Sequence, residues 1–167
     1  MIQKKVCMLG AFAVGKTSLV SQFVSSIFSD TYLSTVGVKI DKKAVTVSGQ
    51  DVTLVLWDLC GADRFQAMQK SYLRGAAGYL LVVDGTRWDT FAEVCELQAL
   101  AASVVGPVPF VLALNKADLA EQWQVDERLL FKVADQGWPI VRTSAKTGQG
   151  VDTAFEMLTQ AMLERQE

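Results

Sequence analysis

The most informative absence in this sequence is histidine, which does not occur among its 167 residues. Neither histidine-based acid–base catalysis nor a histidine-ligated metal site is therefore available to the protein. Its three cysteines, Cys7, Cys60 and Cys95, are odd in number, lie far apart and lack the short spacing of metal ligands. Isolated cysteines of this kind are typical of a reducing compartment, so we expect a cytoplasmic protein.

Long hydrophobic runs and an excess of basic charge are also missing. Half of the residues are hydrophobic, yet no run is long enough to span a membrane. Residues 1–5 lead directly into a predicted strand and leave no room for a signal peptide, and residues 164–167 carry neither a prenylation box nor a polybasic stretch. The formal net charge is −2, and no basic stripe indicates a nucleic-acid partner. We expect one domain over residues 1–167, without a membrane anchor.

The sequence does contain a glycine loop motif: residues 10–17 match the pattern G-x-x-x-x-G-K-[ST] along their whole length. The apolar run before it (6–9) predicts a buried strand, and an amphipathic pattern predicts a helix over 16–26. Strand, glycine loop and helix in this order direct backbone amides and the positive helix end at a phosphate. We expect Lys16 to reach the β- and γ-phosphates of a nucleotide and the Thr17 hydroxyl to ligate Mg²⁺. An ordinary glycine turn before a surface helix is the alternative.

The remaining pattern predicts an α/β protein. A hairpin is expected around Gly49-Gln50, between strands at 38–47 and 52–57. Short aliphatic runs predict further strands, which would be buried on both faces of a parallel sheet, at 79–83, 110–114 and 140–141. Helices are predicted between them at 67–73, 90–104, 126–135 and 151–163. This alternation indicates three layers, with ligands bound at the carboxyl ends of the strands.

The segment after the 110–114 strand indicates which base is bound. It reads Asn115-Lys116-Ala117-Asp118, and a carboxylate there can accept two hydrogen bonds from the N1–H and the amino group of guanine. Adenine offers neither donor, so an unpaired Asp118 would disfavour ATP. Ser144-Ala145-Lys146 follows the last predicted strand. Alone, the four-residue segment could be an ordinary polar loop; with the glycine loop in this order it indicates a guanine nucleotide.

With these motifs in this order, the chain resembles the Ras superfamily of small GTPases over essentially its whole length. Residues 32–38 (Tyr-Leu-Ser-Thr-Val-Gly-Val) and the pattern Trp57-Asp58-x-x-Gly61 are most similar to the Rab branch. The resemblance implies a P-loop NTPase G domain, with a six-stranded mixed, mostly parallel sheet flanked by five helices. It also implies a monomer that binds GTP or GDP with Mg²⁺ and presents two switch segments, 28–37 and 59–73, to an effector. An exchange factor or activating protein would be a further partner, and the missing lipid box favours a soluble, bacterial member.

The resemblance also implies roles for single residues. Phe28 would stack on guanine, and Thr35 would close over the γ-phosphate and share the Mg²⁺ with Thr17 and Asp58. Gly61 would donate its amide to the γ-phosphate. The implied catalytic positions are Lys16, Thr35 and Gly61. The implied nucleotide-binding set is Gly10, Ala13, Val14, Gly15, Lys16, Thr17, Ser18, Phe28, Thr35, Asp58, Gly61, Asn115, Lys116, Asp118, Ser144, Ala145 and Lys146.

Two positions depart from the family pattern. The family orients the attacking water with a glutamine directly after the glycine of the second switch, and here that position is Ala62. The third residue of the glycine loop, usually small, is Phe12, whose ring would project toward the γ-phosphate. We therefore expect binding to be intact and GTP hydrolysis to be very slow, in a switch biased toward its GTP state.

Three alternatives remain at this point. The protein could be an active GTPase in which Asp63, Gln66 or Gln69, or a glutamine from a partner, orders the water. It could bind nucleotide weakly and serve as a structural interaction module, against which Lys16, Thr17, Asp58, Asn115 and Asp118 argue. It could also be an ATP-dependent small-molecule kinase, which Asp118 and the lack of a lid segment disfavour.

Overall fold

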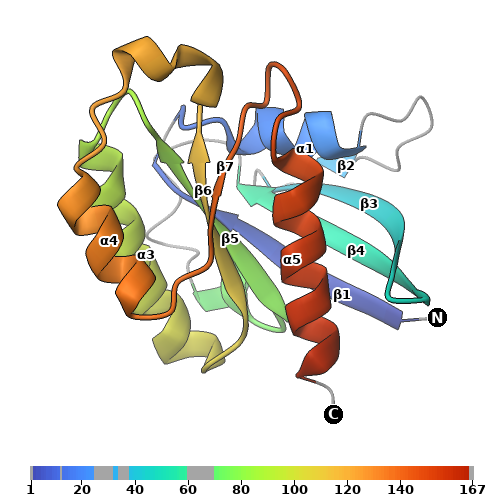
Figure 1. Cartoon of the computed structure of the whole chain (residues 1–167). Helices are drawn as coiled ribbons and strands as arrows, with labels where there is room; N and C mark the ends of the chain where they lie inside the picture. Colours follow the sequence, from blue (N-terminus) through green and yellow to red (C-terminus); the bar gives the residue numbers. More distant parts are fainter. Residues whose placement is uncertain (1, 12, 25–31, 34–37, 60–69, 166–167) are drawn as a thin grey trace.

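The computed structural model is built around one seven-stranded sheet in the order β2-β3-β4-β1-β5-β6-β7 (Figure 1). It describes residues 2–11, 13–24, 32–33, 38–59 and 70–165. The strands are β1 Ile2–Leu9, β2 Tyr32–Leu33, β3 Val38–Val47, β4 Gln50–Leu59, β5 Gly78–Asp84, β6 Phe110–Asn115 and β7 Ile140–Arg142. The helices are α1 Lys16–Val24, α3 Asp89–Val105, α4 Glu127–Asp135 and α5 Val151–Glu164, with a 3₁₀ segment, η2 Ala117–Gln122.

The sheet is mixed and mostly parallel, as the sequence predicts. β3 pairs antiparallel with β4 and with the two-residue β2, and every other neighbouring pair is parallel. The β3–β4 hairpin turns through Ser48 and Gly49, both at positive φ (52° and 77°), which is the geometry of a tight two-residue hairpin turn. Six strands match the predicted ones, and β2 adds a seventh at the edge.

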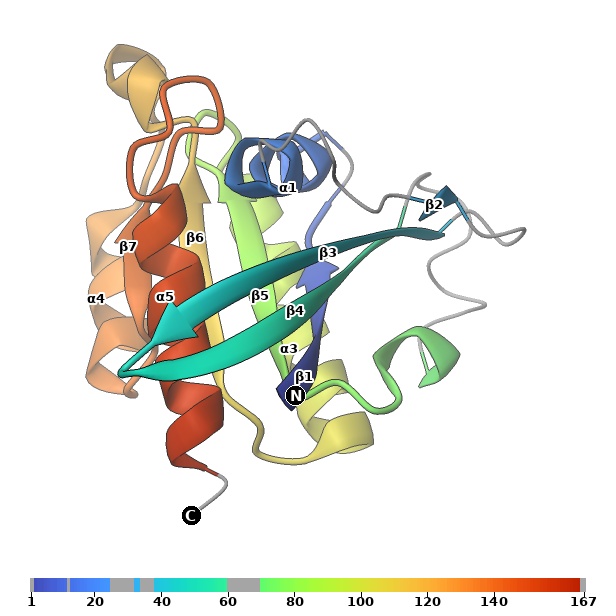
Figure 2. The same cartoon turned by 90° about the vertical axis from the view of Figure 1, so that its right-hand side faces the viewer.

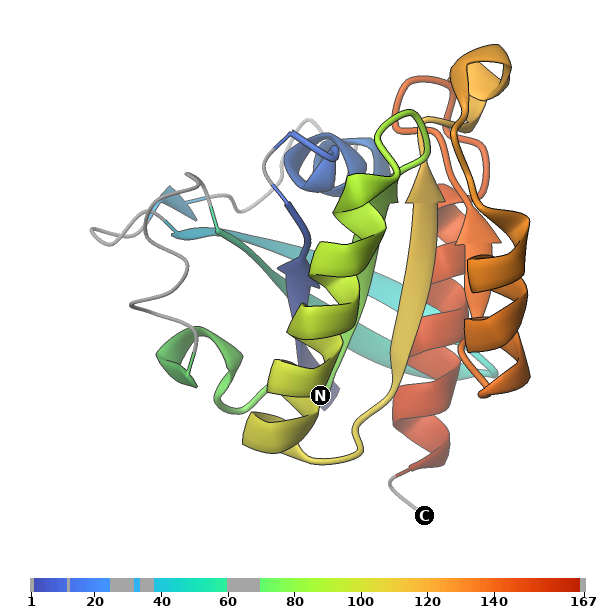
Figure 3. The same ribbon diagram turned by 90° about the vertical axis from the view of Figure 1, so that its left-hand side faces the viewer.

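Helices cover both faces of the sheet and make three layers. α1 and α5 lie on one face, where Phe23 stacks on Phe155 with ring centroids 4.0 Å apart (Figure 2). α3 and α4 lie on the other face (Figure 3). Every residue of β5 is buried, because this strand lies inside the sheet with helices on both sides. That double coverage explains why its sequence is a continuous apolar run.

Most described elements begin and end within two residues of the predicted bounds; the exception is β1, which begins at Ile2 rather than at residue 6. α4 begins after Asp126, whose carboxylate accepts a hydrogen bond from the Arg128 N–H at 3.0 Å and caps the helix. The predicted helix over 16–26 is described as far as Val24. The one predicted over 67–73 is described from residue 70, and residues 70–73 are helical. Among the described residues, no helix is both long and apolar enough to span a bilayer.

The parallel strands place their carboxyl ends at one edge of the sheet. β1 leads there into the glycine loop and α1, and β5 and β6 end beside it (Figure 1). Asp84 and Asn115, the last residues of β5 and β6, are register partners. Polar residues that end these strands are therefore brought together, as expected for an open α/β sheet.

Candidate functional site

Two positions in the loop between β1 and α1, Gly10 and Gly15, have no room for a side chain. A Cβ at Gly10 would lie 2.6 Å from the carbonyl oxygen of Val82, and one at Gly15 would overlap the Asn115 side chain. Gly15 (φ 107°) and Ala13 (φ 62°) both adopt positive φ. The loop is thus folded tightly against β5 and β6, and it leads into the N-terminus of α1, where backbone amides favour an anion.

Lys16 and Thr17, at the start of α1, carry the polar groups of this loop. The Lys16 ammonium donates to the carbonyl oxygens of Gly10 at 2.8 Å and Ala11 at 3.5 Å, so its side chain curls back over the loop. The Thr17 hydroxyl donates to Oδ2 of Asp58, although the two residues are 41 positions apart in sequence. The structure therefore brings together two of the three residues that the sequence predicts for Mg²⁺.

Asp58 is fully buried near the end of β4. Burial raises the pKa of its carboxyl group, while the Thr17 hydrogen bond and the nearby Lys16 charge act in the opposite direction. A hydroxyl and a carboxylate are hard oxygen donors, which fits Mg²⁺ better than a softer ion. The part of the chain that the structure describes contains no group of three or more acidic or cysteine ligands. Mg²⁺ is commonly bound through one or two carboxylates and keeps waters and substrate phosphates as its other ligands.

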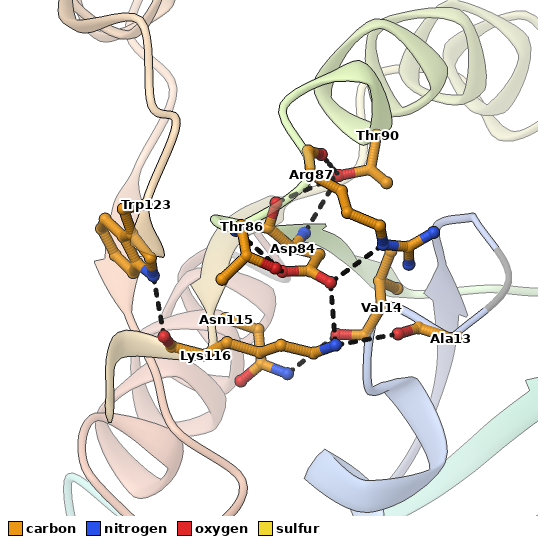
Figure 4. A network of polar contacts seen from close by, with 9 residues as sticks. All are labelled: Ala13, Val14, Asp84, Thr86, Arg87, Thr90, Asn115, Lys116 and Trp123. Carbon is orange, nitrogen blue, oxygen red and sulfur yellow. Dashed lines mark hydrogen bonds and ion pairs between the residues drawn. The ribbon is translucent and has the colours of Figure 1, made fainter. Parts of the chain in front are cut away.

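Asp84, at the end of β5, is the centre of a polar network that sequence reasoning did not predict (Figure 4). Its carboxylate accepts from the Lys116 ammonium at 2.8 Å, the Arg87 Nε at 3.0 Å, and the backbone N–H and hydroxyl of Thr86. Burial alone would raise its pKa, but the hydrogen bonds from Lys116, Thr86 and Arg87 outweigh it and lower the pKa to about 2. Asp84 is therefore a fixed negative charge that orients Lys116.

Asn115 and Lys116 attach the second motif to the glycine loop. The Asn115 amide donates to the Val14 carbonyl oxygen at 2.9 Å, and its oxygen accepts from the Thr143 hydroxyl at 3.0 Å. The Lys116 ammonium reaches the Ala13 carbonyl oxygen at 3.4 Å (Figure 4). Both residues thus hold the glycine loop by its backbone carbonyl oxygens. Asn115 is almost completely buried.

Asp118 is exposed, in contrast to its neighbour Asn115, and is oriented by Ser144. The Ser144 hydroxyl donates to Oδ1 of Asp118 at 2.7 Å, and its oxygen accepts from the Thr147 N–H at 3.1 Å. Ser144 is itself fully buried. A rigid donor therefore holds one carboxylate oxygen, and the edge of Asp118 that faces solvent can accept from a base.

Several predicted site residues lie outside the described part of the chain. They are Phe12, Phe28, Thr35, Gly61 and Ala62, together with most of the two predicted switch segments (28–37 and 59–73) and the alternative water-ordering residues Asp63, Gln66 and Gln69. Ser18, Ala145 and Lys146 are described and lie in the first turn of α1 and after β7, beside the residues above.

The sequence analysis did not predict several residues that bond to the motifs, among them Thr143, Asp84 and Trp123. Asp84 could have been found, because it ends an apolar strand at the edge where the other polar residues gather. Trp123 carries no sequence signal, yet its Nε1–H donates to the Lys116 carbonyl oxygen at 2.7 Å (Figure 4).

Comparison with known proteins places this site in context. The family model described as the Ras family matches residues 5–164. The chain is 33% identical to the Ras-related protein Rab-4 of Dictyostelium discoideum, an alignment that covers 95% of this chain and 78% of that protein. It is 32% identical to the GTP-binding protein ypt1 of Schizosaccharomyces pombe (96% and 80% covered) and 35% identical to the human Ras-related protein Rab-27B (98% and 81%). The matched region contains every motif described above.

Proposed function

Because this chain belongs to the Ras family of small GTPases and is similar to its Rab members, we propose that it is a guanine-nucleotide switch biased toward its GTP-bound state. Proteins of this family bind GTP or GDP with Mg²⁺ and hydrolyse GTP. In this chain the GTP-bound form would persist and present the switch segments to an effector.

The observation that carries the binding proposal is the bond between two motifs that are 101 residues apart. Asn115 holds the Val14 carbonyl, so the segment that would read the base and the loop that would hold the phosphates form one unit. Guanine would be read by Asp118, whose orientation Ser144 sets. We propose the full set of residues named from the resemblance as the nucleotide site, with Thr17, Thr35 and Asp58 holding Mg²⁺.

At the phosphate end, the chain would act by position and charge. Lys16 would place its ammonium against the β- and γ-phosphates, and the Thr17 hydroxyl and Asp58 carboxylate would orient the metal. When bound, Mg²⁺ neutralises charge on the β- and γ-phosphate oxygens. Binding at this end needs no proton transfer, in agreement with a sequence that has no histidine.

The bias toward GTP rests on the chemistry of two positions. The Ala62 methyl group can neither accept a hydrogen bond from the attacking water nor donate one to a γ-phosphate oxygen. Phe12 would fill the space in which an activating arginine inserts. With a glutamine and no activator, hydrolysis proceeds at about 3–5 × 10⁻⁴ s⁻¹ in this kind of protein, and an arginine adds roughly 10³–10⁵-fold. We expect this chain to be slower than the unaided rate and insensitive to such an activator.

The proposal also covers the partners, the oligomeric state and the location of the switch. An effector would bind residues 28–37 and 59–73, and an exchange factor or activating protein would act on the same segments. We propose a monomeric single domain over 1–167 that works in the cytoplasm. Cys7 and Cys95 are free thiols, which supports a reducing compartment.

The test is to denature freshly purified protein and identify the released nucleotide by ion-exchange chromatography. Mostly GTP is the expected result and would mean that hydrolysis is slower than purification. Mostly GDP would contradict the proposed bias, leave guanine-nucleotide binding intact, and point to Asp63, Gln66 or Gln69 as the group that orders the water. Absence of guanine nucleotide, with no binding of added GTP or GDP, would contradict the proposal as a whole.

A further inference from the structure

Trp123 lies directly after η2 and contacts three parts of the site. Its Nε1–H donates to the Lys116 carbonyl oxygen at 2.7 Å. The ring lies against the backbone of Gly85, so closely that a Cβ at that position would overlap it. The Arg142 guanidinium lies 5.1 Å from the ring centroid, within the range of a cation–π contact. The side chain thus joins the ends of β5, β6 and β7.

The backbone that Trp123 holds is in an unfavourable conformation. Lys116 adopts left-handed angles (φ 69°, ψ 38°), which cost energy for a residue other than glycine and persist only where the surroundings enforce them. Its carbonyl oxygen accepts two hydrogen bonds, from the Leu119 N–H at 2.9 Å and from the Trp123 indole. Both lone pairs are therefore used, and only the indole bond comes from a side chain.

This conformation determines where Asp118 lies. Asn115 is fixed to the glycine loop on one side of Lys116, and the chain must turn at Lys116 for Asp118 to reach the Ser144 hydroxyl. Resting on the proposed guanine-nucleotide function, we propose that Trp123 is a positioning residue for base recognition: it holds the left-handed turn at Lys116 and thereby the alignment of Asp118 with guanine. The Trp123 side chain contacts Lys116, Gly85 and Arg142, so we expect its main effect on the base contact rather than on the Thr17–Asp58 pair.

Trp88 offers a matched comparison within the same chain. It stacks on Phe91 with ring centroids 4.6 Å apart, and its Nε1 has no hydrogen-bond partner among the described residues. Changing either tryptophan to phenylalanine keeps an aromatic ring and removes the indole N–H. Only Trp123→Phe also removes a bond to the nucleotide motif.

The experiment measures the release of fluorescently labelled GDP and labelled IDP from loaded protein after addition of excess unlabelled GDP. IDP lacks the amino group of guanine, so it can donate only one of the two hydrogen bonds that Asp118 accepts from guanine. Its release should therefore change less than that of GDP when Asp118 is misaligned. A typical hydrogen bond corresponds to a factor of about three to ten in an equilibrium or rate. Trp123→Phe is expected to accelerate GDP release about five- to tenfold and IDP release by roughly twofold, whereas Trp88→Phe changes each by less than twofold.

Gly85→Ala is a second variant that keeps Trp123 and displaces its ring. Gly85→Ala is expected to accelerate GDP release more than IDP release, as Trp123→Phe is. Unchanged GDP release in both variants would overturn the inference, and so would equal acceleration of GDP and IDP, since a general loosening of the fold acts on both nucleotides alike. If wild-type protein retains neither nucleotide, the proposed function fails and this inference fails with it; if it retains both, only the inference is at stake.

Discussion

The base end and the phosphate end of the site are held in different ways. At the base end, side chains from two separate segments fix the residues that would meet guanine: Asp84, at the end of β5, orients Lys116, and Ser144, in the loop after β7, orients Asp118. The residues that do the orienting, Asp84 and Ser144, are both fully buried. The base end is therefore preorganised by the protein itself, and little ordering is needed when a base binds.

At the phosphate end, the polar side chains that would meet a phosphate and a metal are bonded to the loop backbone or to one another. The Lys16 ammonium is bonded to the Gly10 carbonyl, and the Thr17 hydroxyl to Asp58. A phosphate and a metal would share or replace these bonds. Affinity at the phosphate end must come from charge, and affinity at the base end from the preorganised positions of its hydrogen-bonding groups. Substitutions at the two ends should therefore change nucleotide affinity to different extents.

The largest effect is expected where charge dominates. Lys16→Met removes the cation that would pair with the β- and γ-phosphates, which should cost about 3 kcal/mol of binding energy, or roughly a hundredfold or more in affinity for GDP. Titration of labelled GDP with purified protein measures this change. Lys132→Met, at an exposed position of α4, is the matched control and should bind as the wild type does. A loss of less than tenfold for Lys16→Met would contradict the view that charge dominates this end.

The second-largest effect is expected on stability, from the polar network around Asp84. Asp84 has a pKa of about 2 in the folded protein, below the ordinary value of 3.8, so it binds protons less readily when folded. Its contribution to the free energy of unfolding, about 2 kcal/mol, is complete above about pH 5 and is lost as the pH falls toward 2. Urea unfolding at several pH values measures the loss.

Asp84→Asn separates this contribution from that of other carboxyl groups. The variant should be less stable than the wild type at pH 7, and its stability should fall less steeply between pH 5 and pH 2. Parallel curves for the two proteins would show that Asp84 does not govern acid stability.

A smaller effect is expected from restoring the hydrolytic residues. The double substitution Phe12→Gly and Ala62→Gln should raise the single-turnover rate of GTP hydrolysis about tenfold or more, toward the unaided rate of about 3–5 × 10⁻⁴ s⁻¹. GDP affinity should stay within twofold, because neither substitution removes a charged group from the phosphate end or a hydrogen bond from the base end. An unchanged rate would mean that the two residues do not limit hydrolysis in this chain.

The sequence predicts the strands and helices well because β5 and β6 are buried on both faces, which leaves a continuous apolar signature. It also predicts Lys16, Thr17, Asn115 and Asp118 as candidates, because the motifs that contain them are contiguous. The structure adds the bonds that join one motif to another.

Those bonds depend on register and on side-chain reach, which no local pattern records. Asp84 meets Lys116 because β5 and β6 pair Asp84 with Asn115. Trp123 meets Lys116 only because η2 turns the chain back over Gly85. The β1 strand begins at Ile2 rather than at the predicted residue 6, because its early residues pair with β4 although Lys4 and Lys5 interrupt the apolar pattern.

The smallest effect is expected at Ser144, where a single bond orients Asp118. Ser144→Ala removes the hydroxyl that donates to Oδ1 at 2.7 Å but leaves the carboxylate in an exposed position, where water can replace the lost donor. The net cost should be about 1 kcal/mol, or roughly fivefold in affinity for GDP, with a smaller change for IDP. Ser103→Ala, which removes an exposed hydroxyl on α3, is the control. A loss for Ser144→Ala as large as that for Lys16→Met would contradict the view that charge at the phosphate end contributes more than fit at the base end.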